Sequence, residues 1–154
     1  MQKGPQLLTD ILHQVVSDYY ESGLQIVVVA DGPHQMWLHQ IIREFNLGNR
    51  VAAVNFDEKL SRLAYAGADF MLMPSLFEPC GLPQMVAPIY GTLAVARATG
   101  GIADTVHPLD AETSTGNGFR FEDYPHFTRW MATLILGREL DGHLLFQELE
   151  RVWN

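Results

Sequence analysis

Asp69-Phe70-Met71-Leu72-Met73 and Thr92-Leu93-Ala94-Val95 are two short apolar runs, and the helix-like stretch Leu82–Tyr90 lies between them. Short apolar runs bounded by turn residues are typical of buried strands. Two strands joined through a helix form a βαβ unit, in which the strands run parallel. This stretch therefore predicts an α/β fold built on a parallel sheet, with helices on both faces.

The same alternation of strands and helices continues in both directions along the chain. Leu24–Ala30 is rich in β-branched residues, as expected for a strand that helices cover on both faces. From the apolar periodicity we expect further strands at Arg50–Asn55 and Gly118–Phe121, and helices at Pro5–Glu21, His34–Phe45, Asp57–Ala66, Pro125–Leu136 and Leu140–Val152. The polar segment Asp110–Gly118 is expected to be a surface loop.

Length and charge narrow the classes of protein to consider. The 154 residues suit one domain, long enough to bury a core without disulfides. Ten Lys and Arg residues against 18 Asp and Glu residues give a formal net charge of −8. Because nucleic acids and anionic membranes attract cationic faces, we expect neither as a partner. No apolar run approaches the roughly 20 residues of a membrane-spanning helix, and the amino end lacks the apolar segment of a signal peptide.

Cysteine and histidine usage gives no sign of a metal site. Cys80 is the single cysteine, so an internal disulfide is excluded and a reducing compartment is favoured. The six histidines have no carboxylate or cysteine partner at ligand spacing, so we expect no metal. These features predict an intracellular protein.

Four loops follow the predicted strands, and in an open α/β sheet ligands bind beyond the carboxyl ends of the strands. These loops are Asp31–His34, Phe56–Glu58, Pro74–Gly81 and Arg97–Gly101. The third carries Glu78, a carboxylate just before a predicted helix. Two interpretations stand side by side: Glu78 caps the helix while Cys80 packs as a small apolar residue, or Glu78 accepts hydrogen bonds from substrate hydroxyls while amides at Gly81-Leu82 face an anion.

The fourth loop contains Thr99-Gly100-Gly101. Adjacent glycines let backbone N–H groups approach a phosphate without obstruction by a Cβ, and Thr99 adds a hydroxyl donor. The alternative is an ordinary turn. The pattern is neither G-x-G-x-x-G nor a P-loop, which argues against a dinucleotide site or a P-loop site.

Several motifs together resemble the bacterial glycogen synthase and plant starch synthase family. They are Gln2-Lys3-Gly4, Ala66-Gly67-Ala68-Asp69, Pro74-Ser75, Phe77-Glu78-Pro79-Cys80-Gly81-Leu82, Tyr90-Gly91-Thr92-Leu93, Arg97, Thr99-Gly100-Gly101-Ile102-Ala103-Asp104-Thr105-Val106, Gly118-Phe119 and Phe121-Glu122-Asp123. Members of this family are retaining glucosyltransferases with two facing Rossmann-like domains, the GT-B fold. The resemblance implies that residues 1–154 form a single nucleotide-sugar-binding domain, the carboxyl-terminal half of that fold.

The resemblance also implies roles for individual residues. Lys3 corresponds to the lysine that contacts the donor's phosphates, and Glu78 to the glutamate that orients the transferred glucose; these two are the candidate catalytic residues. The candidate donor-binding residues are Phe56, Cys80, Gly81, Leu82, Thr99, Gly100 and Gly101. Phe56 aligns with an aromatic near the adenine, and its alternative role is a core aromatic at a strand end.

Some positions depart from the family's pattern. Pro83 stands where threonine is usual, Leu76 where arginine is frequent, and Ala98 in place of a second arginine. These differences put individual donor contacts in doubt. Val86 occupies the position where many related sugar transferases carry a second glutamate, which favours the glycogen and starch synthase branch over sucrose-synthase-like relatives.

The resemblance implies a larger enzyme that extends α-1,4-glucan from ADP-glucose, or from UDP-glucose, in the bacterial cytoplasm or the plastid stroma. The transition state of this reaction has oxocarbenium character and a departing diphosphate, so the main catalytic demand is stabilisation of the charge on phosphate. No metal or other cofactor is required if Lys3 and the Thr99-Gly100-Gly101 amides suffice. The glucan acceptor would bind through an amino-terminal domain absent from this sequence, so we expect the chain alone to transfer no glucose. The rival interpretation is a non-catalytic α/β nucleotide-binding or interaction module.

The expected truncation also predicts a topology. The family's first strand would precede Met1, and the carboxyl-terminal helix that returns to the first domain would follow Asn154. The strands near Leu24–Ala30 and Asp69–Met73 would then lack their shared partner, and buried strand edges are too unfavourable to leave unpaired. We expect direct pairing of these two strands, with a strand from another copy or a loosened, aggregation-prone domain as the alternatives.

Overall fold

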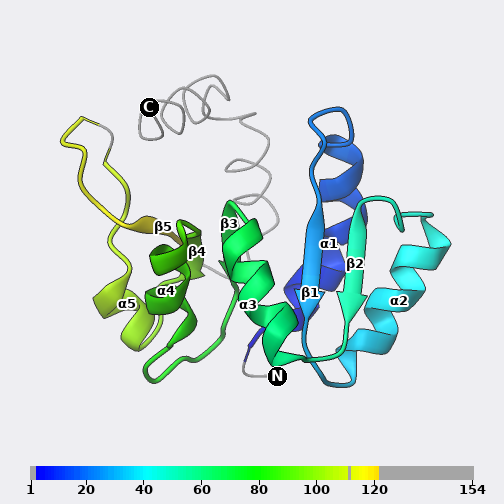
Figure 1. Cartoon of the computed structure of the whole chain (residues 1–154), viewed down its shortest axis with the longest axis horizontal. Helices are drawn as coiled ribbons and strands as arrows, with labels where there is room; N and C mark the ends of the chain where they lie inside the picture. Colours follow the sequence, from blue (N-terminus) through cyan, green and yellow to red (C-terminus); the bar gives the residue numbers. More distant parts are fainter. Residues whose placement is uncertain (1–2, 111, 122–154) are drawn as a thin grey trace. The chain divides into compact units, whose positions relative to one another are not determined.

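Helices and parallel strands alternate along the chain in the computed structural model, which describes residues 3–110 and 112–121 (Figure 1). The chain divides into two units. We call Pro5–Ala68 the upstream unit, and Met1–Gly4 together with Asp69–Asn154 the downstream unit. No helix in the described part of the chain combines the length and the apolar character needed to cross a membrane.

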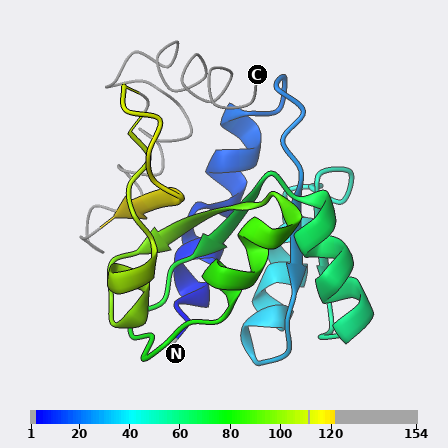
Figure 2. The ribbon, with the colours of Figure 1, turned by 60° about the vertical axis from the view of Figure 1, so that its left-hand side comes forward.

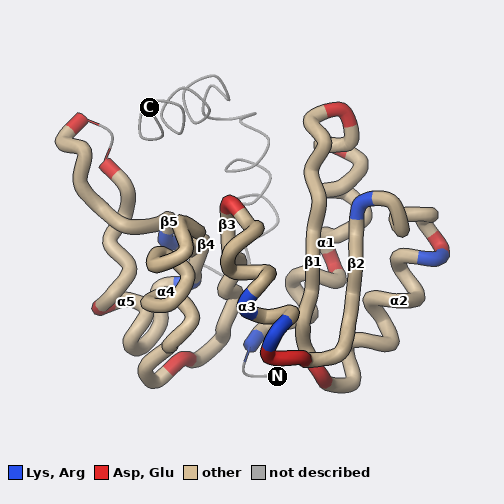
Figure 3. The backbone as a smooth tube through the Cα atoms, viewed as in Figure 1, with Lys and Arg blue, Asp and Glu red and all other residues tan. Residues whose placement is uncertain are grey.

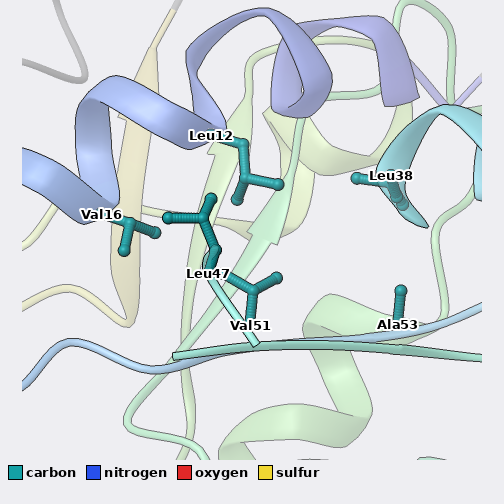
Figure 4. Packing of buried hydrophobic residues seen from close by; sticks show 6 residues of the cluster. All are labelled: Leu12, Val16, Leu38, Leu47, Val51 and Ala53. Atoms are coloured by element: carbon teal, nitrogen blue, oxygen red, sulfur yellow. The ribbon is translucent and has the colours of Figure 1, made fainter. Parts of the chain in front are cut away.

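The upstream unit contains three helices and two parallel strands in its described sequence. They are α1 (Pro5–Asp18), β1 (Ile26–Val29), α2 (His34–Glu44), β2 (Val51–Val54) and α3 (Glu58–Gly67), and Ile26 lies opposite Val51 in the sheet. Apolar residues of α1 and α2 recur at helical spacing and pack on one face of the strands. Figure 4 shows this core, which consists of Leu12, Val16, Leu38, Leu47, Val51 and Ala53.

The downstream unit contains a three-stranded parallel sheet in the order β3-β4-β5. Its elements are β3 (Phe70–Met73), α4 (Pro83–Val86), the 3₁₀ helix η1 (Ala87–Tyr90), β4 (Leu93–Arg97), α5 (Gly101–Thr105) and β5 (Gly118–Phe121), which forms one edge of the sheet (Figure 2). Small strand residues allow close packing here: Ala94 and Ala96 are fully buried against Ile102 and Val106.

The α/β class, the parallel strands and the order of the described elements are confirmed. The expected helix Leu82–Tyr90 is instead two short helices, because Pro88 supplies no amide for an α-helical hydrogen bond. Helix α5 was not predicted, and its first residue, Gly101, was expected to end the loop after β4. The expected helices Pro125–Leu136 and Leu140–Val152 lie outside the described residues.

The strand pairs within the two units differ from the expected direct pairing of Leu24–Ala30 with Asp69–Met73. Strand β1 is hydrogen-bonded to β2 in a two-stranded sheet, whereas β3 is hydrogen-bonded to β4 in the three-stranded sheet. An apolar sequence indicates that a strand is buried, but it does not specify the neighbour. Each of these strands pairs with the next strand along the chain, across one connecting helical segment.

Candidate functional site

The carboxylate of Glu78 is the chemical centre of the loop that follows β3. Glu78 is only 6% exposed. Its Oε2 accepts hydrogen bonds from the Lys3 ammonium, which forms an ion pair with it, and from the Ser75 hydroxyl at 3.3 Å. Among the described residues, Oε1 has no hydrogen-bond donor. A buried carboxylate needs a cationic or hydrogen-bonding partner, and Lys3 supplies the cation.

Lys3 reaches this carboxylate while its own side chain stays 62% exposed. The backbone beside it is fixed by Gly4, which has φ of 63° and approaches the end of β3 closely. A methyl group on Gly4 would lie 2.1 Å from the carbonyl oxygen of Pro74. Glycine is therefore required next to Lys3. The Lys3 ammonium lies beside Glu78, and the exposed part of the Lys3 side chain is accessible to a ligand.

The Gly100-Gly101 turn packs directly on the glutamate loop. A methyl group on Gly100 would lie 2.1 Å from the Glu78 carbonyl oxygen, and one on Gly101 would lie 2.3 Å from that of Cys80. The amide of Gly101 donates to the carbonyls of Glu78 at 3.0 Å and Pro79 at 3.2 Å. The two adjacent glycines thus bring two loops into backbone contact.

These contacts divide the expected phosphate-binding turn. The amides of Gly101, Ile102 and Ala103 all donate within the protein. The amides of Thr99 and Gly100 donate to no backbone carbonyl of the described residues. Any amides offered to an anion therefore come from Thr99 and Gly100 and not from Gly101. The Thr99 hydroxyl lies 3.5 Å from the carbonyl oxygen of Leu76.

The alternative interpretation of the glutamate loop is wrong on both residues. The first turn of α4 has Leu82 at its N-cap and no side-chain cap, so Glu78 does not cap this helix. Cys80 is exposed, so it does not pack as a small apolar residue. Leu82 is exposed and Gly81 is buried with φ of 70°, so the loop presents its outer side chains to solvent.

Phe56 belongs to the upstream unit, directly after β2. Its ring is 58% exposed, so the alternative role as a core aromatic is wrong. Its amide donates to Oδ1 of Asp31 at 3.1 Å, which links the loop after β2 to the loop after β1. An aromatic ring that is held at its backbone and open at its face is suited to stacking on a planar group.

Gln84 is the polar residue at this site that sequence reasoning missed. It is 3% exposed, and its amide nitrogen donates to the carbonyl of Cys80 and to the hydroxyl of Thr105. Glutamine side chains are mostly exposed in folded proteins, so the burial of Gln84 gave no local signal. Among the described residues, Lys and Arg positions occur in both units (Figure 3).

Residues 1–135 match the sequence profile of the family described as "Glycosyl transferases group 1". A glycogen synthase of Lactiplantibacillus plantarum is 41% identical over 153 residues, which are 97% of this chain and 31% of that protein. A glycogen synthase of Clostridium botulinum (strain Eklund 17B / Type B) is 40% identical over 124 residues, covering 80% of this chain and 25% of that protein. The chain thus spans between a quarter and a third of the length of these relatives.

Two solved structures are similar in fold and in sequence. The catalytic domain of starch synthase IV from Arabidopsis thaliana, bound to ADP and acarbose, has a TM-score of 0.68 and 30% identity, over 99% of this chain and 32% of that chain. Anabaena HepE in complex with UDP and glucose has a TM-score of 0.65 and 25% identity, over 92% of this chain and 36% of that chain. These neighbours agree with the expected GT-B type of α/β fold.

Proposed function

This chain belongs to the group 1 glycosyltransferases, and on this premise we propose that it is the donor-binding domain of a glycogen or starch synthase. The whole enzyme would transfer glucose from a nucleotide sugar to an α-1,4-glucan with retention at the anomeric carbon. The observation that carries the proposal is the buried Glu78 carboxylate, held by Lys3 and Ser75 on a loop in backbone contact with Gly100 and Gly101. As in the resembling enzymes, the location would be the bacterial cytoplasm or the plastid stroma.

ADP-glucose is the donor that we propose first. Similarity to bacterial glycogen synthases near 40% identity supports a glucan synthase, and the starch synthase IV structure holds ADP. UDP-glucose is the second candidate, because the HepE structure holds UDP and glucose. The loop residues Cys80, Gly81 and Leu82 would line this donor, and Phe56 would contact its base.

Glu78 and Lys3 would act on the two sides of the bond that breaks. The oxygen Oε1 of Glu78 would accept hydrogen bonds from hydroxyls of the glucosyl group and so orient that group. Oε2 would keep its hydrogen bonds from Lys3 and Ser75. The bond between the sugar and the diphosphate breaks as positive charge develops on the ring and negative charge on the leaving group. The exposed Lys3 ammonium, together with the Thr99 and Gly100 amides, would stabilise the departing diphosphate.

Calorimetric titration of the chain with ADP-glucose, UDP-glucose and ADP tests the proposal. We expect the glucosylated nucleotide to bind more tightly than ADP, because Glu78 adds contacts to the sugar. The variant Glu78→Gln should bind ADP within about twofold of wild type and lose the preference for ADP-glucose, since a carboxylate is the stronger acceptor. Failure of the wild-type chain to bind any of the three ligands would support the rival interpretation as a non-catalytic interaction module.

A further inference from the structure

A partly buried network of hydrogen bonds connects the glutamate loop to the start of α5, and the buried Gln84 is its centre. The side-chain nitrogen Nε2 of Gln84 donates to the Cys80 carbonyl at 3.0 Å and to the Thr105 hydroxyl at 3.0 Å. The hydroxyl of Thr105 in turn donates to the Gly101 carbonyl at 2.6 Å. Three hydrogen bonds thus link Cys80, in the loop after β3, with Gly101, in the turn after β4.

The network requires a neutral group with two N–H donors, which is what a primary amide offers. A carboxylate at position 84 would place a charge there and supply no donor for the Cys80 carbonyl. An apolar side chain would leave that carbonyl without its amide partner. The other amide atom, Oε1, is buried and accepts no hydrogen bond from the described residues. The site therefore tolerates an unpaired carbonyl oxygen while both donors are used, although such an oxygen is unfavourable.

The Gln84 amide is also packed against the glutamate loop. Gly81 has φ of 70°, and a methyl group on it would lie 2.4 Å from Oε1 and 2.5 Å from Nε2 of Gln84. The amide therefore occupies the volume that any other residue at position 81 would need. The Gln84 amide thus packs on Gly81 and donates to the neighbouring Cys80, so it contacts two consecutive residues of the same segment.

We infer that Gln84 is a positioning residue, which keeps the loop that carries Glu78 at a fixed distance from the Thr99–Gly101 turn. The inference rests on the proposed function, in which Glu78 recognises the glucosyl group while Thr99 and Gly100 bind the diphosphate. The glucosyl group and the diphosphate are joined by a single bond. If the distance between Glu78 and the Thr99–Gly101 turn changes, a ligand can contact Glu78 or the turn but not both at once. Gln84 touches neither ligand group in this scheme; it acts through the backbone of Cys80 and through Thr105.

The test is the ratio of the affinities for ADP-glucose and ADP, measured by calorimetry on the 154-residue chain. The variant Gln84→Met keeps the volume and removes both donors. We expect it to lower the affinity for ADP-glucose about tenfold and the affinity for ADP much less, so that the ratio falls. Gln40→Met is the matched control, because Gln40 is exposed and its amide bonds only to Glu44 among the described residues; it should leave both affinities unchanged.

Two further variants keep the test decisive if Gln84→Met does not fold. Thr105→Val removes the hydroxyl that links Gln84 to Gly101 and should lower the affinity ratio, whereas Thr105→Ser should restore it. Gln84→Glu gives a pH signature: a protonated carboxyl donates one hydrogen bond, so its ratio should improve as the pH falls. A merely structural role would change stability without changing the ratio of the two affinities.

The outcomes separate this inference from the proposed function. If wild type prefers ADP-glucose but Gln84→Met has the same ratio as Gln40→Met, Gln84 does not position the loop. Equal ratios in Thr105→Val and Thr105→Ser would overturn the inference in the same way. If wild type binds neither ligand, the proposed function fails, and the inference fails with it.

Discussion

Replacing Gly100 by alanine is the most informative single change, because two measurable penalties coincide there. Gly100 has φ of 48° and ψ of −135°. Residues other than glycine adopt this backbone conformation only at a free-energy penalty of about 1–3 kcal/mol. The added methyl group would also lie 2.1 Å from the Glu78 carbonyl oxygen. That oxygen cannot move freely, since it accepts the Gly101 amide. Overpacking of this kind adds about 1–3 kcal/mol.

We therefore expect Gly100→Ala to lower the free energy of unfolding by about 2–6 kcal/mol, the sum of these two terms. Gly91→Ala is the matched control: Gly91 has φ of 89° but no atom within 4 Å of an added methyl group. Backbone strain alone should make it less stable by about 1–2 kcal/mol. Denaturant unfolding measures both changes.

The same pair of variants separates folding from ligand binding. Gly100→Ala displaces the main chain of Glu78, so we expect it to lose the preference for ADP-glucose over ADP, whereas Gly91→Ala keeps it. Equal losses of stability in the two variants, or a normal preference in Gly100→Ala, would refute the close contact between the two loops.

Three other changes test separate parts of the molecule. Lys3→Met should lower the free energy of unfolding by about 1–3 kcal/mol, because the buried Glu78 carboxylate loses its cation, and Lys3→Arg should restore most of it; thermal unfolding compares them. Phe56→Ala should change stability by less than about 0.5 kcal/mol, since the ring is exposed, yet weaken ADP binding in calorimetry by about 1–3 kcal/mol if the ring stacks on the base. Hydrogen bonds from the side chain and backbone of Thr113 lower the pKa of Asp110. Because the folded-state pKa is the lower one, Asp110 stabilises the protein above the usual aspartate pKa, and this contribution disappears as the pH falls through the folded-state value; unfolding of Asp110→Asn and wild type across acidic pH should show the difference closing.

The strands could be predicted from the sequence because their signal is local. Phe70–Met73 and Gly118–Phe121 lie in runs whose composition and bounding turns identify them directly. The neighbours of a strand depend on residues far apart in the chain, so the local apolar pattern of Leu24–Ala30 could not identify β2 as the strand hydrogen-bonded to β1.

The candidate site was predictable where a motif carries it. Glu78 and Gly100 were singled out from the loops that follow predicted strands, and the family resemblance supported both. The reason given for Gly100 was incomplete: its missing Cβ leaves room for the Glu78 carbonyl as well as for any ligand. Gln84 gave no signal, because its role depends on contacts with Cys80 and Thr105 that only the folded chain brings together. The close contact of Gly4 with Pro74 depends on folding in the same way.

The central claim is that this chain binds a nucleotide sugar and that Glu78 recognises its glucosyl group. Saturation-transfer NMR with ADP-glucose tests it most directly, because the signal reports which protons of the ligand touch the protein. The account predicts saturation of both adenine and glucosyl protons in the wild-type chain, and selective loss of the glucosyl signal in Glu78→Gln. Saturation of the adenine protons alone in wild type, or a glucosyl signal that Glu78→Gln leaves unchanged, would contradict it.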